Sequence, residues 1–321
     1  MKYELYDALI LGGGPAGLTA AIYTSRAHLN TVVLAGSPPG GQLINTTDVE
    51  NYPGFPEGIL GPDLVTNFRK QASRFGATFL DKNAVEITGS FQQGFTTKDE
   101  SGAEYKSKTI VIATGASAKW LGLESETRLK GKGVSACAVC DGFFFKDKVV
   151  AVVGAGDSAM EESIFLTKYA SKIYILIRSN LENMKASKIM QKRAMENPKI
   201  EFVFNTEVIE VLGENSVTGL KIHNTQTGQE SQMDIQGLFL AIGHEPNTKF
   251  LQGFIDLDDH GYIKVEKYTG SSKEGVFVGG DVSDYRYRQA VTAAGLGCMA
   301  ALDAEKFLAQ HGVETVGGTS W

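Results

Sequence analysis

The sequence predicts an α/β protein with two Rossmann-like nucleotide-binding domains, each built from three layers. The chain has 321 residues, which is enough for about two domains of ordinary size. Two glycine-rich turns, starting at Gly12 and Gly154, each stand between a strand-like and a helix-like segment. Because the turns begin 142 residues apart, they cannot belong to one strand–helix–strand unit.

The composition narrows the class of protein. Hydrophobic residues make up 42% of the chain and charged residues 21%, as in a soluble globular protein. The net charge of −6 argues against a nucleic-acid binder. No apolar run approaches the ~20 residues that span a bilayer, so no membrane partner is expected. The N-terminal residues enter a strand without a signal-peptide layout, and a cytoplasmic location is therefore expected.

The first turn lies between an apolar strand-like segment and a helix-like segment. It consists of Gly12, Gly13, Gly14, Pro15, Ala16 and Gly17. The first glycine allows a tight turn, the third lets the backbone approach a pyrophosphate, and the last lets helix and strand pack closely. The helix N-terminus then faces the anion. The next strand-like segment, residues 31–34, ends in Ala35 without the usual carboxylate for a ribose hydroxyl, so that contact must come from elsewhere.

The second turn has the same form with a final alanine. It consists of Gly154, Ala155, Gly156, Asp157, Ser158 and Ala159. It follows the strand-like residues 149–153, and the next strand-like segment, residues 172–177, ends at Arg178. This pattern predicts a second nucleotide-binding domain.

Two more segments have the form of cofactor loops. Residues 110–115 run from an apolar strand into Ala113, Thr114 and Gly115, and residues 275–281 run into Gly279, Gly280 and Asp281. The carboxylate of Asp281 can accept a hydrogen bond from a ribityl or ribose hydroxyl. Ordinary strand exits are the alternative interpretation.

Cys137 and Cys140 form the most informative pair in the chain. Two thiols at this spacing can close a disulfide and reopen it, and Asp141 directly behind them is a candidate proton donor or acceptor. In a cytoplasmic protein such a pair is catalytic or metal-binding more often than structural. The five histidines are scattered singly and supply no further ligands for a tetrahedral zinc, so no metal site is predicted. Cys298, in an apolar helix-like stretch, is expected in the core.

Together these motifs resemble the low-molecular-weight thioredoxin reductases, which are FAD-dependent disulfide reductases of the pyridine-nucleotide family. The resemblance covers nearly the whole chain in order. The matching segments are 12–17 (GGGPAG), 40–43 (GGQL), 49–54 (VENYPG), 113–115 (ATG), 137–142 (CAVCDG), 241–244 (AIGH), 280–282 (GDV) and 287–290 (YRQA).

The resemblance implies an FAD-binding domain made of residues 1–117 and 246–321. Residues 118–245 would form an inserted pyridine-nucleotide-type domain that carries the dithiol, and the protein would be a homodimer. Val85 would lie near the adenine of FAD. The FAD contacts implied in this way are Gly12, Gly14, Pro15, Ala16, Gly17, Gln42, Asn51, Val85, Ala113, Thr114, Gly115, Gly280, Asp281, Arg288, Gln289 and Ala290.

The resemblance also implies roles for the dithiol. Cys140 would face the flavin, and Cys137 would attack the disulfide of thioredoxin through a mixed disulfide, which Cys140 then resolves. Asp141 would protonate or deprotonate a thiol during the exchange. Ser135 and Ala136 are small and would leave room for a protein substrate.

The turn after residues 172–177 departs from the family. In family members this turn reads approximately His-Arg-Arg, and another arginine follows shortly after. These arginines together bind the 2′-phosphate of NADPH. Of these arginines only Arg178 remains in this chain, since Ser179 stands in place of the second. Glu182 adds the opposite charge, and Lys185 follows about two residues later than the further arginine of the family. Each lost arginine contact costs about 1.5–3 kcal/mol, or roughly ten- to hundred-fold in affinity. We therefore predict a degraded NADPH site, which comprises Gly154, Gly156, Asp157, Ser158, Ala159 and Arg178.

The electron donor stays open at this point. The turn resembles that of reductase branches that do not rely on NADPH, including ferredoxin-dependent flavin thioredoxin reductases, in which ferredoxin is the donor. An NADPH site that still works despite these changes is the alternative. We further hypothesise that the C-terminal Trp321 stacks on the flavin ring and blocks the nicotinamide position, against the alternative that it packs in a surface groove.

Two other functions fit parts of the pattern. A ferredoxin- or flavodoxin-NADP-type flavin reductase shares the fold but lacks the dithiol. A non-catalytic nucleotide sensor would have no use for Cys137, Cys140 and Asp141 in this arrangement.

Overall fold

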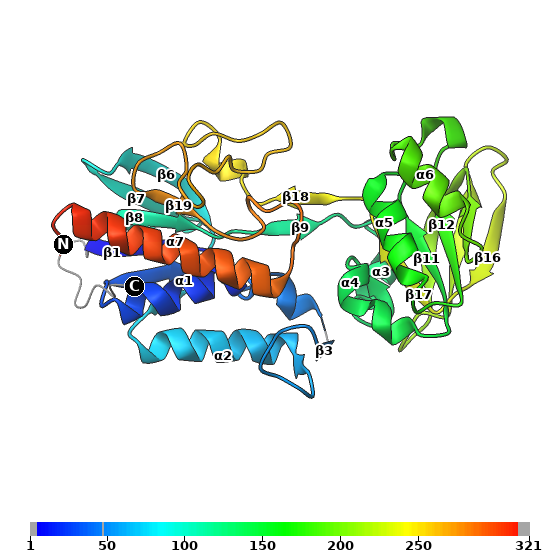
Figure 1. Ribbon diagram of the computed structural model, residues 1–321, viewed down its shortest axis with the longest axis horizontal. Helices are drawn as coiled ribbons and strands as arrows, with labels where there is room; N and C mark the ends of the chain where they lie inside the picture. Colours follow the sequence, from blue (N-terminus) through cyan, green and yellow to red (C-terminus); the bar gives the residue numbers. More distant parts are fainter. Residues whose placement is uncertain (1–4, 47, 314–321) are drawn as a thin grey trace. The chain divides into compact units, whose positions relative to one another are not determined.

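The computed structural model describes residues 5–46 and 48–313, and the chain divides into two compact units (Figure 1). The first unit comprises Met1–Ser117 and Glu245–Trp321, and the second comprises Ala118–His244. The two chain segments that connect the units, β9 (Ala116–Ala118) and β18 (His244–Pro246), pair as a two-stranded sheet. The predicted α/β class is confirmed by the parallel sheets of both units.

The first unit is built on a seven-stranded sheet in which five strands are parallel. The parallel strands are β5 (Thr78–Leu80), β2 (Thr31–Leu34), β1 (Leu5–Leu11), β8 (Glu104–Ile112) and β19 (Val276–Val278). The antiparallel strands β7 (Gly94–Asp99) and β6 (Ala84–Ser90) continue the sheet beside β8. The order β5-β2-β1-β8 places the carboxyl ends of β1, β2 and β8 at one edge, where a dinucleotide binds in folds of this type.

The strands of this sheet are apolar on both faces because both faces are covered. Ile10, Val33 and Val111 face the helices α1 (Pro15–Arg26), α2 (Gly61–Arg74) and α7 (Ala290–Gln310). Leu9 and Leu11 point to the opposite face. There they cluster with apolar side chains of β6 and β7, which belong to the same sheet, and of the segment after β18. Helix α7 lies along α1 (Figure 1).

The second unit has three clear layers. Its central sheet is parallel, in the order β10 (Val134–Ser135), β17 (Gly237–Leu240), β11 (Val149–Val153), β12 (Lys172–Leu176) and β13 (Ile200–Val203). Helices α5 (Asp157–Leu166) and α6 (Lys188–Met195) cover the face that carries Val150 and Val152. The antiparallel strands β14 (Thr206–Leu212), β15 (Gly219–Asn224) and β16 (Glu230–Asp234) form a small sheet on the face that carries Ala151.

The remaining elements are short. They are β3 (Asp48–Val49), β4 (Ile59–Leu60), α3 (Glu124–Arg128), α4 (Ala138–Asp141), and the 3-10 helices η1 (Gly41–Asn45), η2 (Gly142–Phe145), η3 (Leu181–Asn183) and η4 (Lys249–Leu251). One prediction needs correction: Cys298 is only half-buried, because it lies on a flank of α7 beside Tyr23.

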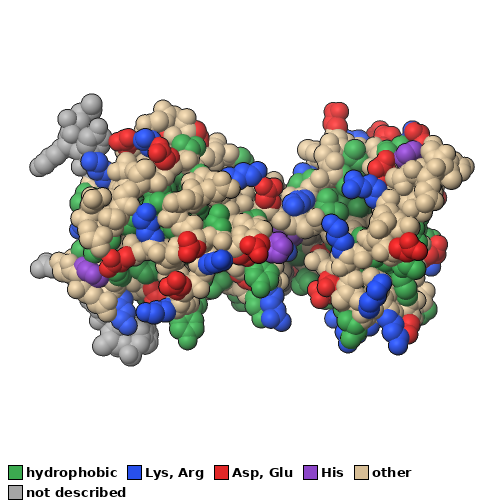
Figure 2. Space-filling model, turned by 90° about the horizontal axis from the view of Figure 1, so that it is seen from above, with side chains coloured by type: hydrophobic (Ala, Val, Ile, Leu, Met, Phe, Trp, Pro, Cys, Tyr) green, Lys and Arg blue, Asp and Glu red, His purple; other side chains and the backbone are tan. Residues whose placement is uncertain are grey.

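The surface drawn in Figure 2 mixes acidic and basic side chains, and neither sign forms a continuous stripe there. In residues 5–46 and 48–313, no helix has the length and apolar character needed to cross a membrane.

Candidate active site

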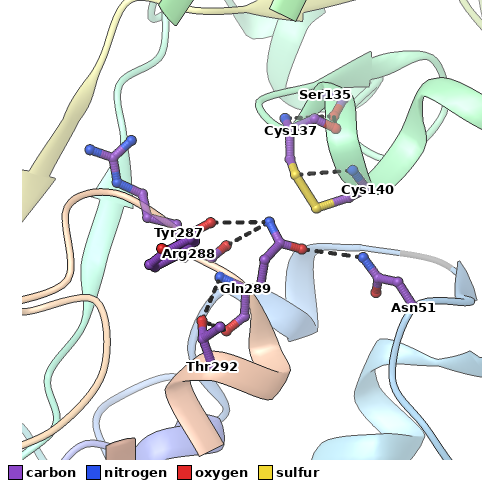
Figure 3. The surroundings of a disulfide bond; sticks show 8 residues. All are labelled: Asn51, Ser135, Cys137, Cys140, Tyr287, Arg288, Gln289 and Thr292. Carbon is purple, nitrogen blue, oxygen red and sulfur yellow. Dashed lines mark hydrogen bonds between the residues drawn. A yellow bond between two sulfur atoms is a disulfide. The ribbon is translucent and has the colours of Figure 1, made fainter. Parts of the chain in front are cut away.

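The dithiol begins a short helix in the second unit. Cys137 and Cys140 form a disulfide across the start of α4, with their Cα atoms 5.3 Å apart (Figure 3). The backbone N–H of Cys140 donates to the Sγ of Cys137 at 3.2 Å, so the sulfur occupies the N-cap position of the helix. A backbone hydrogen-bond donor is therefore already directed at the Cys137 sulfur.

The backbone of Cys137 is fixed from both sides. Its N–H donates to the Oγ of Ser135 at 3.0 Å, and its carbonyl accepts from the N–H of Asp141 at 3.1 Å. Ser135 ends β10, which pairs with Phe239 of β17 in the central sheet. The dithiol is therefore attached to the sheet rather than carried on a free loop.

Asp141 directly follows Cys140 in the chain, and its side chain is half-buried. Burial raises the pKa of its carboxyl group, and a hydrogen bond with the Ser135 side chain partly opposes this rise. A carboxyl group whose pKa is raised above its ordinary value holds a proton more readily than a solvent-exposed one. The direction of this shift is consistent with the predicted role of Asp141 in proton exchange.

The first glycine turn forms a cradle at the edge of the first unit's sheet. Gly12 has a φ of +118°, and a Cβ there would collide with the carbonyl oxygen of Ala113 at the end of β8. A Cβ at Gly17 would collide with the carbonyl oxygen of Gly12. Gly280 also packs here, since its Cβ would lie 2.8 Å from the Cβ of Ala16. The glycine turn and the residues that follow β8 and β19 therefore lie together. These are the segments that we predict to contact one nucleotide.

The second cofactor loop places Asp281 near the same edge. Its Oδ1 is buried and has no hydrogen-bond partner among the described residues. Burial raises the pKa of this carboxyl group to about 7, with a further rise from Asp284 and an opposing effect of Arg288. A buried carboxylate oxygen without a partner is costly unless a ligand supplies the donor. A ribityl or ribose hydroxyl is such a donor.

Helix α7 starts within a hydrogen-bonded network of predicted site residues (Figure 3). Gln289 is its N-cap residue and forms a capping box with Thr292. The Nδ2 of Asn51 donates to the Oε1 of Gln289 at 3.3 Å, which joins two predicted FAD contacts that are distant in sequence. Ala290 is the first residue of the helix. Two residues before it, Arg288 has a φ of +48°, and its guanidinium group donates to the Tyr262 hydroxyl at 3.3 Å.

Other predicted contacts line the same edge of the sheet. Gln42 is exposed in η1, where the adjoining Gly41 packs against Gly14. Val85 is 47% exposed on β6. The neighbouring Asn83 accepts a hydrogen bond from the Ser37 N–H at 3.1 Å, which ties this segment to the loop after β2.

Thr114 and Gly115 are held by a residue that sequence reasoning missed. The hydroxyl of Thr114 donates to the carbonyl of Asn247 at 2.9 Å, and the Asn247 side chain donates back to the carbonyl of Thr114 at 2.9 Å. The Asn247 N–H also donates to the carbonyl of Gly115 at 3.0 Å. Asn247 follows β18, about 130 residues later in the chain, so no local sequence signal marks this contact.

These features fit FAD. The glycine cradle admits a pyrophosphate, Asp281 needs a hydroxyl donor, and the exposed apolar side chain of Val85 suits an adenine ring. Trp321, the predicted flavin-stacking residue, lies outside the described residues.

The second glycine turn adopts a similar form in the other unit. Gly154 has a φ of +152°, and a Cβ there would clash with Ala241 at the end of β17. Gly156 is open, Ser158 is exposed and Ala159 is fully buried at the start of α5. The turn therefore presents free space beside a helix N-terminus, as a phosphate-binding turn does.

The segment after β12 is tied to this turn by its backbone. The N–H groups of Lys185 and Ala186 both donate to the carbonyl of Ala155, at 3.0 and 2.9 Å. The N–H of Ser187 donates to the Oδ1 of Asp157 at 2.7 Å. Arg178 is exposed at the end of β12, and Glu182 is exposed in η3. An acidic side chain thus shares the segment with the one remaining arginine of the turn.

No metal site emerges from the described part of the chain, which contains no group of three or more His, Cys, Asp and Glu side chains placed to hold an ion.

Comparison with known proteins defines the class first. The family model described as "Pyridine nucleotide-disulphide oxidoreductase" matches residues 6–297. The chain therefore belongs to the pyridine nucleotide-disulphide oxidoreductases, and its relatives place it among the thioredoxin reductases of that family.

Those relatives match nearly end to end. The chain is 49% identical to a thioredoxin reductase of Streptomyces clavuligerus over 310 residues, covering 95% of each protein. It is 50% identical to one of Rickettsia conorii, covering 94% of this chain and 97% of that protein. The crystal structure of a thioredoxin reductase from Streptococcus pyogenes superimposes with a TM-score of 0.90 at 37% identity, covering 95% of this chain and 99% of that one.

The family membership confirms the predicted fold of two Rossmann-like domains, the enzyme class and FAD as cofactor. The individual site residues and the division of labour between the units remain predictions.

Proposed function

We propose that this protein is an FAD-dependent disulfide reductase that passes electrons through Cys137 and Cys140 to the disulfide of thioredoxin. The observation that supports this most is the disulfide at the start of α4, with a partly buried carboxyl group directly behind it. A structural disulfide needs no adjacent proton donor, whereas thiol–disulfide exchange does.

The exchange with thioredoxin balances as two sulfur displacements. The Cys137 thiolate attacks one sulfur of the substrate disulfide, whose S–S bond breaks and whose other sulfur leaves as a thiolate. Cys140 then attacks Cys137, closes the internal disulfide and releases the second substrate thiolate. The substrate gains two electrons and two protons, and Asp141 is the group placed to exchange a proton at the dithiol.

FAD, when bound, supplies the electron pair that reopens the internal disulfide. We assign the first unit to FAD and the second to the dithiol and a pyridine-nucleotide-type site. In the first unit, Asp281 would hold a hydroxyl of the cofactor, and the glycines of residues 12–17 would admit its pyrophosphate. Asn51 and Gln289 would hold the start of α7 against it.

Apolar side chains next to the dithiol are the expected contact for the protein substrate. Val139, between the two cysteines, is 55% exposed, and Phe143, just after them, is 58% exposed. Exposed apolar side chains that lie close together often mark a protein–protein interaction site. They support thioredoxin, or a thioredoxin-like protein, as the partner.

The donor is the second part of the proposal. We propose that NADPH is used weakly, because Ser179 and Glu182 stand where the 2′-phosphate needs positive charge. Ferredoxin is the alternative donor. The second glycine turn keeps an open phosphate-binding form, which supports the competing view that a nucleotide still binds there.

We also propose a cytoplasmic homodimer. The outer side of α7 carries Val291, Met299 and Leu302, each between 38% and 43% exposed and spaced to form one stripe. An apolar helical stripe of this kind favours association with a second copy. Light scattering of the purified protein would show a mass of one chain if this is wrong.

The donor and cofactor assignments share one experiment. The purified protein should be yellow from bound FAD. Under anaerobic conditions, flavin reduction is followed after mixing with NADPH, NADH or reduced ferredoxin in parallel. Slow bleaching by NADPH supports a degraded site, and rapid bleaching by NADPH would overturn that part of the proposal. A purified protein without flavin would count against the function itself.

A further inference from the structure

Asn247 uses both polar groups of its side chain on one short segment of the chain. Its Nδ2 donates to the carbonyl of Thr114 at 2.9 Å, and its Oδ1 accepts from the hydroxyl of Ser117 at 3.1 Å. The backbone of Asn247 adds a hydrogen bond to the Gly115 carbonyl at 3.0 Å and one from the Thr114 hydroxyl at 2.9 Å. These hydrogen bonds, which we call the Asn247 clasp, hold the whole stretch from Thr114 to Ser117.

The Asn247 clasp lies where the two connecting segments join the first unit. Thr114 and Gly115 stand between β8 and β9, and Asn247 directly follows β18. Strands β9 and β18 pair with each other and link the two units (Figure 1). The next residue, Thr248, is 3% exposed, and its hydroxyl donates to the Gly261 carbonyl at 2.6 Å. Asn247 is thus held in place independently of the loop that it clasps.

The Asn247 clasp occupies the carbonyl groups of the loop and leaves its N–H groups open. Within the described residues, the N–H groups of Thr114 and Gly115 have no hydrogen-bond acceptor. Both residues are half-buried, and the Thr114 nitrogen lies beside the first glycine turn, 3.1 Å from where a Cβ of Gly12 would stand. Because N–H groups shielded from water normally have a partner, this arrangement suits a ligand that carries acceptor atoms. FAD carries them in its pyrophosphate and in its flavin ring.

The loop needs support from outside because a glycine makes it flexible. Gly115 has a φ of +68°, and a Cβ there would meet nothing within 4 Å, so side-chain packing does not hold this position. A glycine without such constraints adopts many backbone conformations. Hydrogen bonds to both loop carbonyls select one conformation before the cofactor arrives, and preorganisation of this kind raises affinity by lowering the cost of ordering on binding.

We propose that Asn247 is a positioning residue of the FAD site, which holds Thr114 and Gly115 so that their N–H groups are presented to acceptor atoms of the cofactor. This inference rests on the proposed assignment of the first unit to FAD. It adds a residue that is not among the predicted contacts and that acts on the cofactor only through the loop.

The first measurement is the FAD affinity of the full-length protein, from which FAD is removed and to which it is titrated back. The change in flavin fluorescence on binding gives the dissociation constant. Asn247→Ala should raise it about tenfold, because the loop loses a hydrogen bond and must be ordered on binding. Ser117→Ala, which removes only the partner of Oδ1, should have a smaller effect. Ser117→Thr keeps the hydroxyl and should bind FAD as the parent does.

Thr248→Val is the matched control for a merely structural effect. It removes a buried hydroxyl next to Asn247 but leaves the Asn247 clasp intact. It should make the flavin-free protein easier to unfold in urea, while the dissociation constant for FAD stays at the parent value.

Hydrogen exchange tests the two N–H groups directly. Added FAD should slow the exchange of the Thr114 and Gly115 amides in the parent, as followed by mass spectrometry of overlapping peptides. At saturating FAD this protection should be weaker in Asn247→Ala and unchanged in Thr248→Val. Neither measurement needs flavin reduction or thioredoxin, so a protein that fails to reduce thioredoxin can still pass both.

An unchanged dissociation constant in Asn247→Ala would overturn the proposal, as would FAD binding that leaves both amides unprotected in the parent. If the alanine variant does not fold, Asn247→Asp gives the same test, since it keeps the size of the side chain and the acceptor for Ser117 but loses the Nδ2 donor. Equal FAD affinity of that variant and the parent would overturn the proposal. A parent that binds no FAD would overturn it together with the assignment of the first unit to FAD.

Discussion

Asp141 is the residue on which the proposed chemistry depends most after the sulfurs. Asp141→Asn keeps the size of the side chain but cannot exchange a proton. We expect the single-turnover reduction of thioredoxin to slow by about 10²-fold or more, a typical loss for a general acid–base group. The disulfide should still form, because its geometry depends on the α4 backbone. Rapid mixing followed by a thiol reagent measures the rate of thioredoxin reduction and the number of free cysteines in the enzyme. An unchanged rate of thioredoxin reduction would remove Asp141 from the mechanism.

Asp281 should make the stability of the flavin-free protein depend on pH. Its pKa is about 7 in the folded state and near 4 when unfolded, so the folded state binds more protons between these values. The free energy of unfolding should therefore fall as pH rises from about 4 to 7, by up to about 1.4 kcal/mol per pH unit. Below about pH 4, the contribution of Asp281 to the free energy of unfolding is present in full.

Asp281→Asn is the matched variant for this prediction. It should flatten the pH dependence, and urea unfolding of the flavin-free protein at several pH values would show it. If the parent and the variant give parallel curves, Asp281 is not held in the environment described. Added FAD should be bound less tightly by the variant, since an amide is a weaker acceptor for a cofactor hydroxyl than a carboxylate.

At the scale of elements, the close contact between α1 and α7 depends on one glycine. A Cβ at Gly297 would collide with the backbone of Ala16, in the first turn of α1. Gly297→Ala should destabilise the protein by about 1–3 kcal/mol through overpacking and weaken FAD retention, because α1 carries the cradle. Thermal unfolding and flavin release measure both effects.

Gly295→Ala, two residues earlier in α7, is the control for that prediction. A Cβ at Gly295 meets nothing within 4 Å, and alanine favours helix by about 0.5–1 kcal/mol over glycine. This variant should be slightly more stable than the parent. Equal destabilisation by both substitutions would mean that the helix itself, rather than its approach to α1, is sensitive.

Much of the fold follows from local patterns in the sequence. The strand–turn–helix segments at residues 8–23 and 149–166 are visible because glycine spacing and apolar runs are local. The apolar helix-like stretch around Cys298 proved to be part of α7, which starts at Ala290, where Gln289 and Thr292 form a capping box. The N-terminal half of this helix is rich in small residues, which lack the spaced large apolar side chains that mark a helix in a sequence.

The finer details of the site depend on contacts between distant segments. Asn247 holds Thr114, and Asn51 holds Gln289 from 238 residues away. Such pairs leave no periodic trace in one sequence. The Ser135 contact is local, but a serine two residues before a cysteine is too common to mark a site.

At the scale of the whole molecule, the proposed weak use of NADPH depends on the turn after β12. Ser179→Arg should restore a 2′-phosphate contact and lower the KM for NADPH about tenfold. The KM for NADH, which has no 2′-phosphate, should not change. Steady-state kinetics with both nucleotides make the comparison, and equal effects on both would argue against a missing phosphate contact.

The route by which electrons leave is the central claim, and one anaerobic single-turnover experiment tests it most directly. The holoprotein is reduced with dithionite, freed of excess reductant and mixed with oxidised thioredoxin, and the new thiols on thioredoxin are counted. Delivery through Cys137 and Cys140 predicts one thioredoxin dithiol per electron pair in the parent and none above background in Cys140→Ser with flavin still reduced. Thioredoxin that stays oxidised in the presence of the reduced parent, or equal reduction by Cys140→Ser, would contradict the claim.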